Sequence, residues 1–343
     1  MEPDDLYTLR TCYYLGHYKL ALEEGENISH RTMSANLATE RLEFVTRANI
    51  ANGTYSGTSM PMNDGSTASL QMLHVLYLIT TTTSSSSKNN DDTSSSRSST
   101  EEFVHQIESL LSHNNTNNNT NNMNMNDVVT KSYNTDSSLQ LFAGYAFLHL
   151  GLLKEALQLQ SVQFGISMEH IALKLQIYMK YDRLDLAKEQ LQLMKQVDED
   201  ATLTVLCSAM IATMGGGVSG KDGGEEAVYM YQTLSEQYGP SLMLLNGLAV
   251  AYMKCGNFEA AAVQIEEALT NAMDDDSNSN GNGNGRVVAD CLVNAVAIYQ
   301  NLGNVSKVES TLQTLKSKYG GHPYVSALNT VEQAFQRVCA QYA

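Results

Sequence analysis

Apolar residues recur along much of the chain with the period of an α-helix. Before Gly256 they have the i, i+3, i+4, i+7 spacing of one buried helix face, at Leu245, Leu248, Ala249 and Tyr252. After the glycine, the buried face of a second helix is marked by Phe258, Ala261, Ile265 and Ala268. Glycine suits the end of a helix, where the backbone turns with a positive φ. The pattern predicts two helices joined by a turn at Gly256.

The same template occurs at other places in the chain. Its apolar and turn positions are Ala143, Gly144, Phe147, Gly151, Leu153 and Ala156; Ile171, Leu175, Tyr178, Asp182, Leu184, Ala187 and Leu191; Leu292, Ala295, Val296, Tyr299, Gly303, Val305 and Leu312; and, in a weaker copy, Leu9, Cys12, Gly16, Tyr18 and Ala21. The turn at Gly151 precedes that at Asp182 by 31 residues, and Gly256 follows after 74, or two repeats of 37. Residues 201–240 fit as a distorted copy, with Asp200 expected to cap its first helix.

A helix pair of about 34 residues with small side chains at fixed positions resembles the tetratricopeptide repeat. Small residues such as Gly144, Ala249, Ala156 and Ala261 allow helix axes to approach to roughly 8–10 Å. Since one pair cannot bury its apolar face alone, at least three must stack. We therefore expect an all-α fold, a right-handed α-solenoid of tetratricopeptide-like helix pairs that spans residues 1–343 as a single unit.

Three polar tracts interrupt the helical pattern. Residues 81–100, 113–126 and 274–285 consist almost entirely of Ser, Thr, Asn, Asp and Gly. Segments of this composition cannot bury enough apolar surface to order themselves. We expect low-complexity loop insertions at these places.

Charge and cysteine content restrict the possible partners and compartment. The 343 residues include 21 Lys or Arg and 37 Asp or Glu, a formal net charge of −16. Nucleic acids and anionic membranes attract basic surfaces, so neither is an expected direct partner. Five separated cysteines without a CxxC pair indicate reduced thiols, and the acidic first residues do not resemble a secretory signal. We expect a cytoplasmic protein.

The glycine-rich segment 215–222, GGGVSGKD, is the strongest candidate for chemistry. Gly215, Gly220 and Lys221 match part of a phosphate-binding loop, but Asp222 replaces the hydroxyl residue that would hold Mg²⁺. The preceding segment also has the pattern of a helix rather than a strand. We interpret the segment as a loop between helices. No catalytic, metal or cofactor site is expected, and we predict that the protein is not an enzyme.

One stretch is more specific than a generic repeat. Residues 181–204, YDRLDLAKEQLQLMKQVDEDATLT, resemble the epsilon subunit family of coatomer, which carries a very similar helix and turn. The resemblance continues through SLMLLNGLAVAYMKCGNFEAA and the closing HPYV and QRVCAQYA segments, and covers residues 130–343. At the other end, LYTLRTCYYLGHYKLAL is similar in pattern.

The resemblance implies a non-catalytic structural subunit of the COPI vesicle coat. It implies binding to the C-terminal region of the coatomer alpha subunit, retrograde Golgi-to-ER and intra-Golgi transport, and attachment to Golgi membranes and COPI-coated vesicles through other coat subunits. We expect the concave face of the solenoid to clamp the alpha subunit. Repeat logic places these residues on it: Leu141, Tyr145, Leu148, Gln176, Met179, Asn246, Val250, Met253, Val293 and Ala297.

Two other functions stay open at this point. A repeat co-chaperone or scaffold would grip a C-terminal carboxylate with Lys, Arg and Asn, whereas the positions above offer only Gln176 and Asn246 among apolar residues. A nucleotide-binding protein rests on residues 215–222 alone. The sequence favours the coat subunit.

Overall fold

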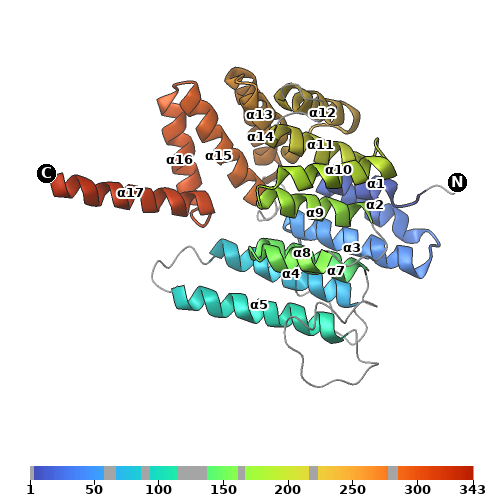
Figure 1. Cartoon of the computed structure of the whole chain (residues 1–343). Helices are drawn as coiled ribbons and strands as arrows, with labels where there is room; N and C mark the ends of the chain where they lie inside the picture. Colours follow the sequence, from blue (N-terminus) through green and yellow to red (C-terminus); the bar gives the residue numbers. More distant parts are fainter. Residues whose placement is uncertain are drawn as a thin grey trace.

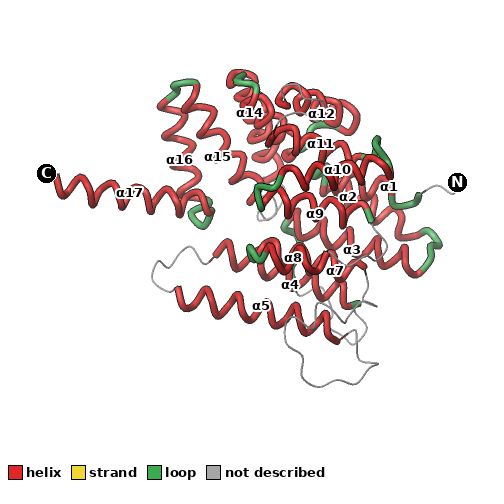
Figure 2. Tube along the Cα trace, viewed as in Figure 1, coloured by secondary structure: helices red, strands yellow, loops and turns green. Residues whose placement is uncertain are grey.

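The computed structural model describes residues 4–57, 67–85, 93–113, 137–160, 167–215, 223–276 and 285–342. Within these ranges all regular structure is helical, and no strand occurs (Figure 2). The α-helices are α1 (Tyr7–Tyr14), α2 (Tyr18–Asn27), α3 (Ala35–Asn52), α4 (Ala68–Ser85), α5 (Thr93–His113), α7 (Ser137–His149), α8 (Leu153–Gln160), α9 (Met168–Lys180), α10 (Leu184–Val197), α11 (Thr202–Gly215), α12 (Gly223–Tyr238), α13 (Leu242–Lys254), α14 (Phe258–Asp276), α15 (Gly285–Asn301), α16 (Val305–Lys318) and α17 (Pro323–Tyr342). A short 3-10 helix, η1 (Ile28–His30), follows α2.

From α7 to α16 the helices pack in chain order (Figure 1). The odd-numbered helices α7, α9, α11, α13 and α15 also contact one another in succession and form one layer. The even-numbered helices from α8 to α16 form the second layer, in which each packs on its odd-numbered neighbours. This two-layer stacking confirms the predicted all-α solenoid of tetratricopeptide-like helix pairs.

Each predicted turn joins two helices of a pair through a left-handed residue. Gly16, Gly151, Gly256 and Gly303 have φ between 70° and 80°, a conformation that glycine adopts without steric cost. In the remaining pair, α9 and α10, Asp182 holds the same position with φ of 58°. The local sequence therefore located all five of these turns.

Small residues let the paired helices approach closely, as expected. Ala156, Ala249 and Ala261 are completely buried. A Cβ atom added to Gly144 would lie 2.5 Å from Nε2 of Gln160 and 2.8 Å from a methyl of Leu173. Nothing larger than glycine fits at that point without movement of its neighbours.

The polar tracts are in part helical, contrary to the expectation of loops. Helix α4 continues to Ser85 and α5 begins at Thr93, so both helices enter the 81–100 tract. The last residues of α14 likewise lie in the third tract, and α15 begins at the final residue of that tract, Gly285. Threonine side chains in α4 donate to main-chain carbonyls one turn back, Thr82 to Leu78 at 2.8 Å, and thus satisfy their hydroxyl groups within the helix. The remaining tract residues, including 114–126, lie outside the described residues.

Asp200 does not cap α11 as predicted. The helix begins at Thr202, so the residue before it is Ala201. The main-chain nitrogen of Asp200 instead donates to the carboxylate of Asp198 at 3.1 Å. Asp198 thus closes a local turn between α10 and α11.

Candidate partner-binding surface

The predicted partner-binding residues lie on α7, α9, α13 and α15, the layer whose members contact one another. Leu141 is only 3% exposed and belongs to the core around α4 and α7, so it cannot contact a partner in this structure. The other nine positions are partly buried. The structure thus places nine of the ten at the boundary between core and surface.

This surface combines apolar methionine side chains with one polar link between repeats. Met179 packs on the core between α9 and α11, and Met253 packs on the core between α13 and α15, each with part of its side chain exposed. Between α13 and α15 the amide of Asn294 donates to Oδ1 of Asn246 at 2.8 Å. This polar link joins two neighbouring repeats on an otherwise apolar face.

Tyr145 faces the chain's own N-terminal helices. Burial raises the pKa of its hydroxyl, with a further rise from the charge of Glu169, while Arg47 on α3 opposes both. Tyr13 of α1 also lies within electrostatic reach. Tyr145 packs on the core around α4 and α7, and charged and aromatic groups of the N-terminal helices lie near this part of the surface that repeat logic assigns to the partner.

The centre of this region is a buried ion pair. Arg47 donates to both carboxylate oxygens of Glu169, at 2.7 and 3.3 Å, and its side chain is 8% exposed. The guanidinium carbon lies 4.4 Å from the ring centre of Tyr13, 4.7 Å from that of Phe44 and 5.3 Å from that of Phe142. Burial lowers the pKa of Arg47, but Glu169, Tyr13 and Tyr145 together outweigh burial, and the pKa lies well above its ordinary value. Four helices, α1, α3, α7 and α9, meet at this charge.

A second contact joins the α1–α2 turn to the start of α13. Ser241 accepts from the main-chain nitrogen of Leu244 and caps α13, while its hydroxyl donates to the carbonyl of Leu15 at 2.5 Å. Leu15 is completely buried in the core shared by α11, α12 and α13. The N-terminal helix pair is thus packed into the middle of the solenoid, although more than 220 residues separate it from Ser241.

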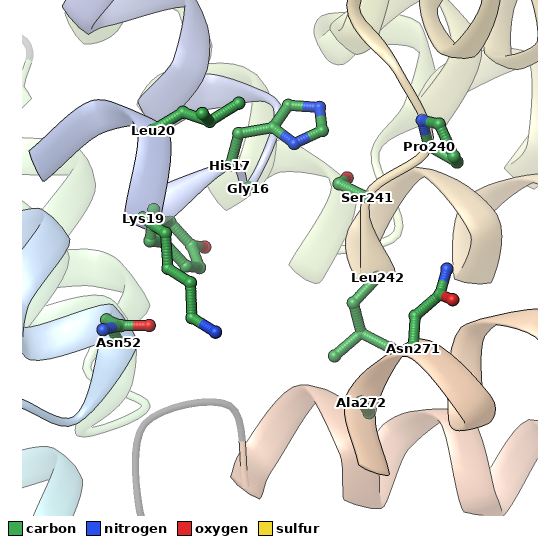
Figure 3. Close-up of a pocket in the computed structure, with 11 residues that line it drawn as sticks. Gly16, His17, Lys19, Leu20, Asn52, Pro240, Ser241, Leu242, Asn271 and Ala272 are labelled. Atoms are coloured by element: carbon green, nitrogen blue, oxygen red, sulfur yellow. The ribbon is translucent and has the colours of Figure 1, made fainter. Parts of the chain in front are cut away.

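A small cavity of about 160 Å³ lies along this seam. Figure 3 shows His17 and Lys19 on its N-terminal side, opposite Ser241 and Asn271. Nε2 of His17 donates to the carbonyl oxygen of Gly239 at 3.2 Å. Burial lowers the pKa of His17, against a smaller rise from that hydrogen bond. The cavity is too small for a drug-sized ligand, which needs roughly 300 Å³ or more.

The structure gives no support to a nucleotide site in the part of the chain that it describes. Gly215 ends α11, a helix where a phosphate-binding loop needs a strand, and residues 216–222 lie outside the described ranges. Among the described residues no three His, Cys, Asp or Glu side chains are grouped as metal ligands. None of the five cysteines, all within the described ranges, forms a disulfide.

Repeat periodicity missed the closure by the N-terminal helices. Only Gly16 and Ser241 carried a local signal, as a turn residue and a helix cap. Neither signal indicates which distant segment of the chain the residue contacts. The contact became visible only in three dimensions.

Comparison with known proteins decides the family. The family model for the coatomer epsilon subunit matches residues 2–123 and 91–343, which together span nearly the whole chain. The chain belongs to the coatomer epsilon subunit family. Coatomer subunit epsilon-1 of Arabidopsis thaliana is 30% identical over 343 residues, covering 99% of this epsilon-family chain and 98% of the relative. Coatomer subunit epsilon of Dictyostelium discoideum is 25% identical and covers 98% of each.

A tetratricopeptide repeat protein from Parabacteroides merdae is 13% identical, with a TM-score of 0.48, and covers 88% of this epsilon-family chain and 93% of that protein. No helix among the described residues is long and apolar enough to cross a membrane. Membership of the family supports a role as a coatomer subunit, a structural component of a coat.

Proposed function

We propose that this chain is a non-catalytic structural subunit of the COPI coat that binds the C-terminal region of the coatomer alpha subunit. In this role it supports retrograde Golgi-to-ER and intra-Golgi vesicle transport. The observation that carries the proposal is the family match over nearly the whole chain. The surface we assign to the partner is the partly exposed, mostly apolar part of the layer formed by α7, α9, α13 and α15.

The assigned surface consists of the predicted positions that the N-terminal helices and the core leave open. They are Leu148, Gln176, Met179, Asn246, Val250, Met253, Val293 and Ala297. Methionine side chains are flexible and polarizable, so they adapt to the shape of an apolar partner. A stable complex needs roughly 1,600 Å² of buried surface, more than two or three of these residues supply. We therefore expect the partner segment to span several repeats.

Attachment to membranes would run through the partner. A net charge of −16 opposes direct binding to anionic lipids. We propose a cytoplasmic protein that reaches Golgi membranes and COPI-coated vesicles as part of the assembled coat. The same charge argues against binding to nucleic acid.

A triple substitution on the assigned surface tests the proposal. The variant places three negative charges on this surface through Met179→Asp, Val250→Asp and Met253→Asp. It should keep its helicity but no longer copurify with the alpha subunit. Tyr145 is left intact because it packs on the internal core around α4 and α7. Val263→Asp is the matched control, since Val263 on α14 is 61% exposed and lies in the other layer.

The possible outcomes separate the candidate functions. Loss of the alpha subunit with the triple variant and its retention with Val263→Asp support the proposal. Retention by the triple variant would refute this surface. Recovery of chaperones with no coat subunit, from the unaltered chain, would favour the co-chaperone function instead.

A further inference from the structure

The last helix, α17, leaves the body of the solenoid. Figure 1 shows it extending from the α15–α16 pair toward the C-terminus, away from the other helices. Only Val325 in its first turn is buried, against Ala289, Leu292 and Leu315. The rest of this 20-residue helix has little contact with the chain.

An apolar stripe with the spacing of a coiled coil runs along α17. Its members, separated alternately by four and three residues, are Tyr324, Leu328, Val331, Phe335, Val338 and Tyr342. This alternation is the a/d pattern by which one helix packs along another. Tyr324 and Leu328 are partly buried, whereas the last four are 64%, 68%, 51% and 88% exposed. We call these last four residues the α17 stripe.

The spacing of the α17 stripe is symmetric. Its intervals are four, three and four residues, so it reads the same in both directions. When two copies of the helix lie antiparallel, Val331 meets Tyr342 of the second copy and Phe335 meets its Val338. A twofold contact between two copies requires such a self-complementary surface. Binding to an unrelated partner helix does not require this symmetry.

The charge distribution favours contact at this end of the molecule. Residues 285–343 contain five Lys or Arg and three Asp or Glu, a net charge of +2, while the whole chain carries −16. The acidic excess therefore lies in the earlier repeats. Two copies that meet through α17 keep those like charges far apart, and charge repulsion falls with distance.

We propose that the α17 stripe is a self-association surface that joins two copies of this chain as an antiparallel helix pair. The four exposed side chains present on the order of 500 Å², and two copies together bury roughly 1,000 Å², the lower limit for a specific interface. The contact is therefore weak in dilute solution. It strengthens where many copies are held side by side, because tethering raises their effective concentration.

Sedimentation of the purified full chain tests the proposal. The mean mass should rise from monomer toward dimer as protein concentration increases from micromolar to hundreds of micromolar. Phe335→Glu places a charge in the centre of the stripe and should leave a monomer at every concentration. Gln333→Glu, an exposed residue on the opposite side of the same helix, is the control and should still dimerise. A monomeric unaltered chain, or a dimer that survives Phe335→Glu, would overturn the proposal.

Cross-linking tests the antiparallel arrangement. Cys339 is exposed beside the stripe, and the symmetry places the two copies of this residue about five residues, or roughly 7.5 Å, apart along axes some 8–10 Å from each other. A short bis-maleimide should link the full chains through Cys339. The product should disappear in Cys339→Ser and persist in Cys255→Ser, which removes the other exposed cysteine. Linkage through Cys255 alone would contradict this geometry.

The self-association surface is separate from the surface assigned to the alpha subunit. Phe335→Glu should retain copurification with that subunit, and the triple variant at Met179, Val250 and Met253 should retain dimerisation. Loss of dimerisation with intact alpha binding would leave the proposed function standing. Loss of alpha binding in Phe335→Glu would show that α17 binds another coat subunit instead of a second copy, and would overturn the self-association.

Discussion

The buried pair of Arg47 and Glu169 should be a principal determinant of how firmly the N-terminal helices are held. Both side chains are largely buried, at 8% and 14% exposed, and they meet in a two-pronged hydrogen bond. Removal of one member of a buried pair leaves the other charge without a partner, at a cost of about 3–5 kcal/mol. We expect Arg47→Met, which keeps much of the apolar stem, and Glu169→Met each to lower the free energy of unfolding by about 3 kcal/mol.

The double variant distinguishes pairing from simple loss of contacts. With both charges removed, no buried charge is left unpaired, so the double variant should lose less free energy of unfolding than either single variant. The expected coupling is thus at least about 3 kcal/mol, the upper end of the range for residues in contact. Urea unfolding followed by circular dichroism measures these differences. Additive losses, or single losses near zero, would refute the reasoning.

The position of the helices that lose stability gives a second test of the Arg47–Glu169 pair. The pair joins α3 to α9, so its loss should raise amide hydrogen exchange in α1 and α3 more than in α15 and α16. Arg183→Met is the control because the Arg183–Asp185 pair is exposed on both sides, and it should give no measurable loss. Uniformly faster exchange in all helices would show that the pair does not act locally.

Three further predictions follow from single positions. Gly247→Ala should lower stability by about 1–3 kcal/mol in thermal unfolding, because the added Cβ would lie 2.6 Å from the ring of Tyr231; an unchanged melting temperature would contradict this. Asp182→Gly should raise stability by about 0.5 kcal/mol in urea unfolding, since it relieves a left-handed conformation at φ of 58°, and a loss would show that the side chain has another role. His17 and His170, whose pKa values burial lowers, favour the folded state while neutral, so stability should be present above pH 6.5 and fall as the pH drops below it; stability that is constant from pH 7.5 to 5 would disprove their contribution.

Helix pairs and turns could be predicted because their causes are local. A glycine at a turn, an alanine between two helices and an apolar residue every three or four positions act over one or two helical turns. Gly256, Ala261 and Tyr299 therefore lie where the periodicity placed them. The extension of α4 into the polar tract was missed, because composition does not reveal that Thr81 and Thr82 donate to carbonyls of their own helix.

The partner-binding surface was predictable only in outline, since periodicity orients a side chain but does not tell what covers it. Leu141 and Tyr145 have the same repeat positions as exposed-layer residues, yet the first lies in the core and the second packs on that core near the N-terminal helices. Nothing in the local pattern of α7 distinguishes them from Leu148. Coverage depends on segments far away in the sequence, such as α4 for Leu141 and α3 for Tyr145.

The amino-acid sequence by itself determined the helix pairs and their turns, because each is encoded in residues close together in the chain. Only the tertiary structure decided that the solenoid folds back on its N-terminal helices. Arg47 meets Glu169 across 122 residues, and Ser241 meets Leu15 across 226. Those contacts depend on the accumulated curvature of all the intervening repeats, which no single repeat contains.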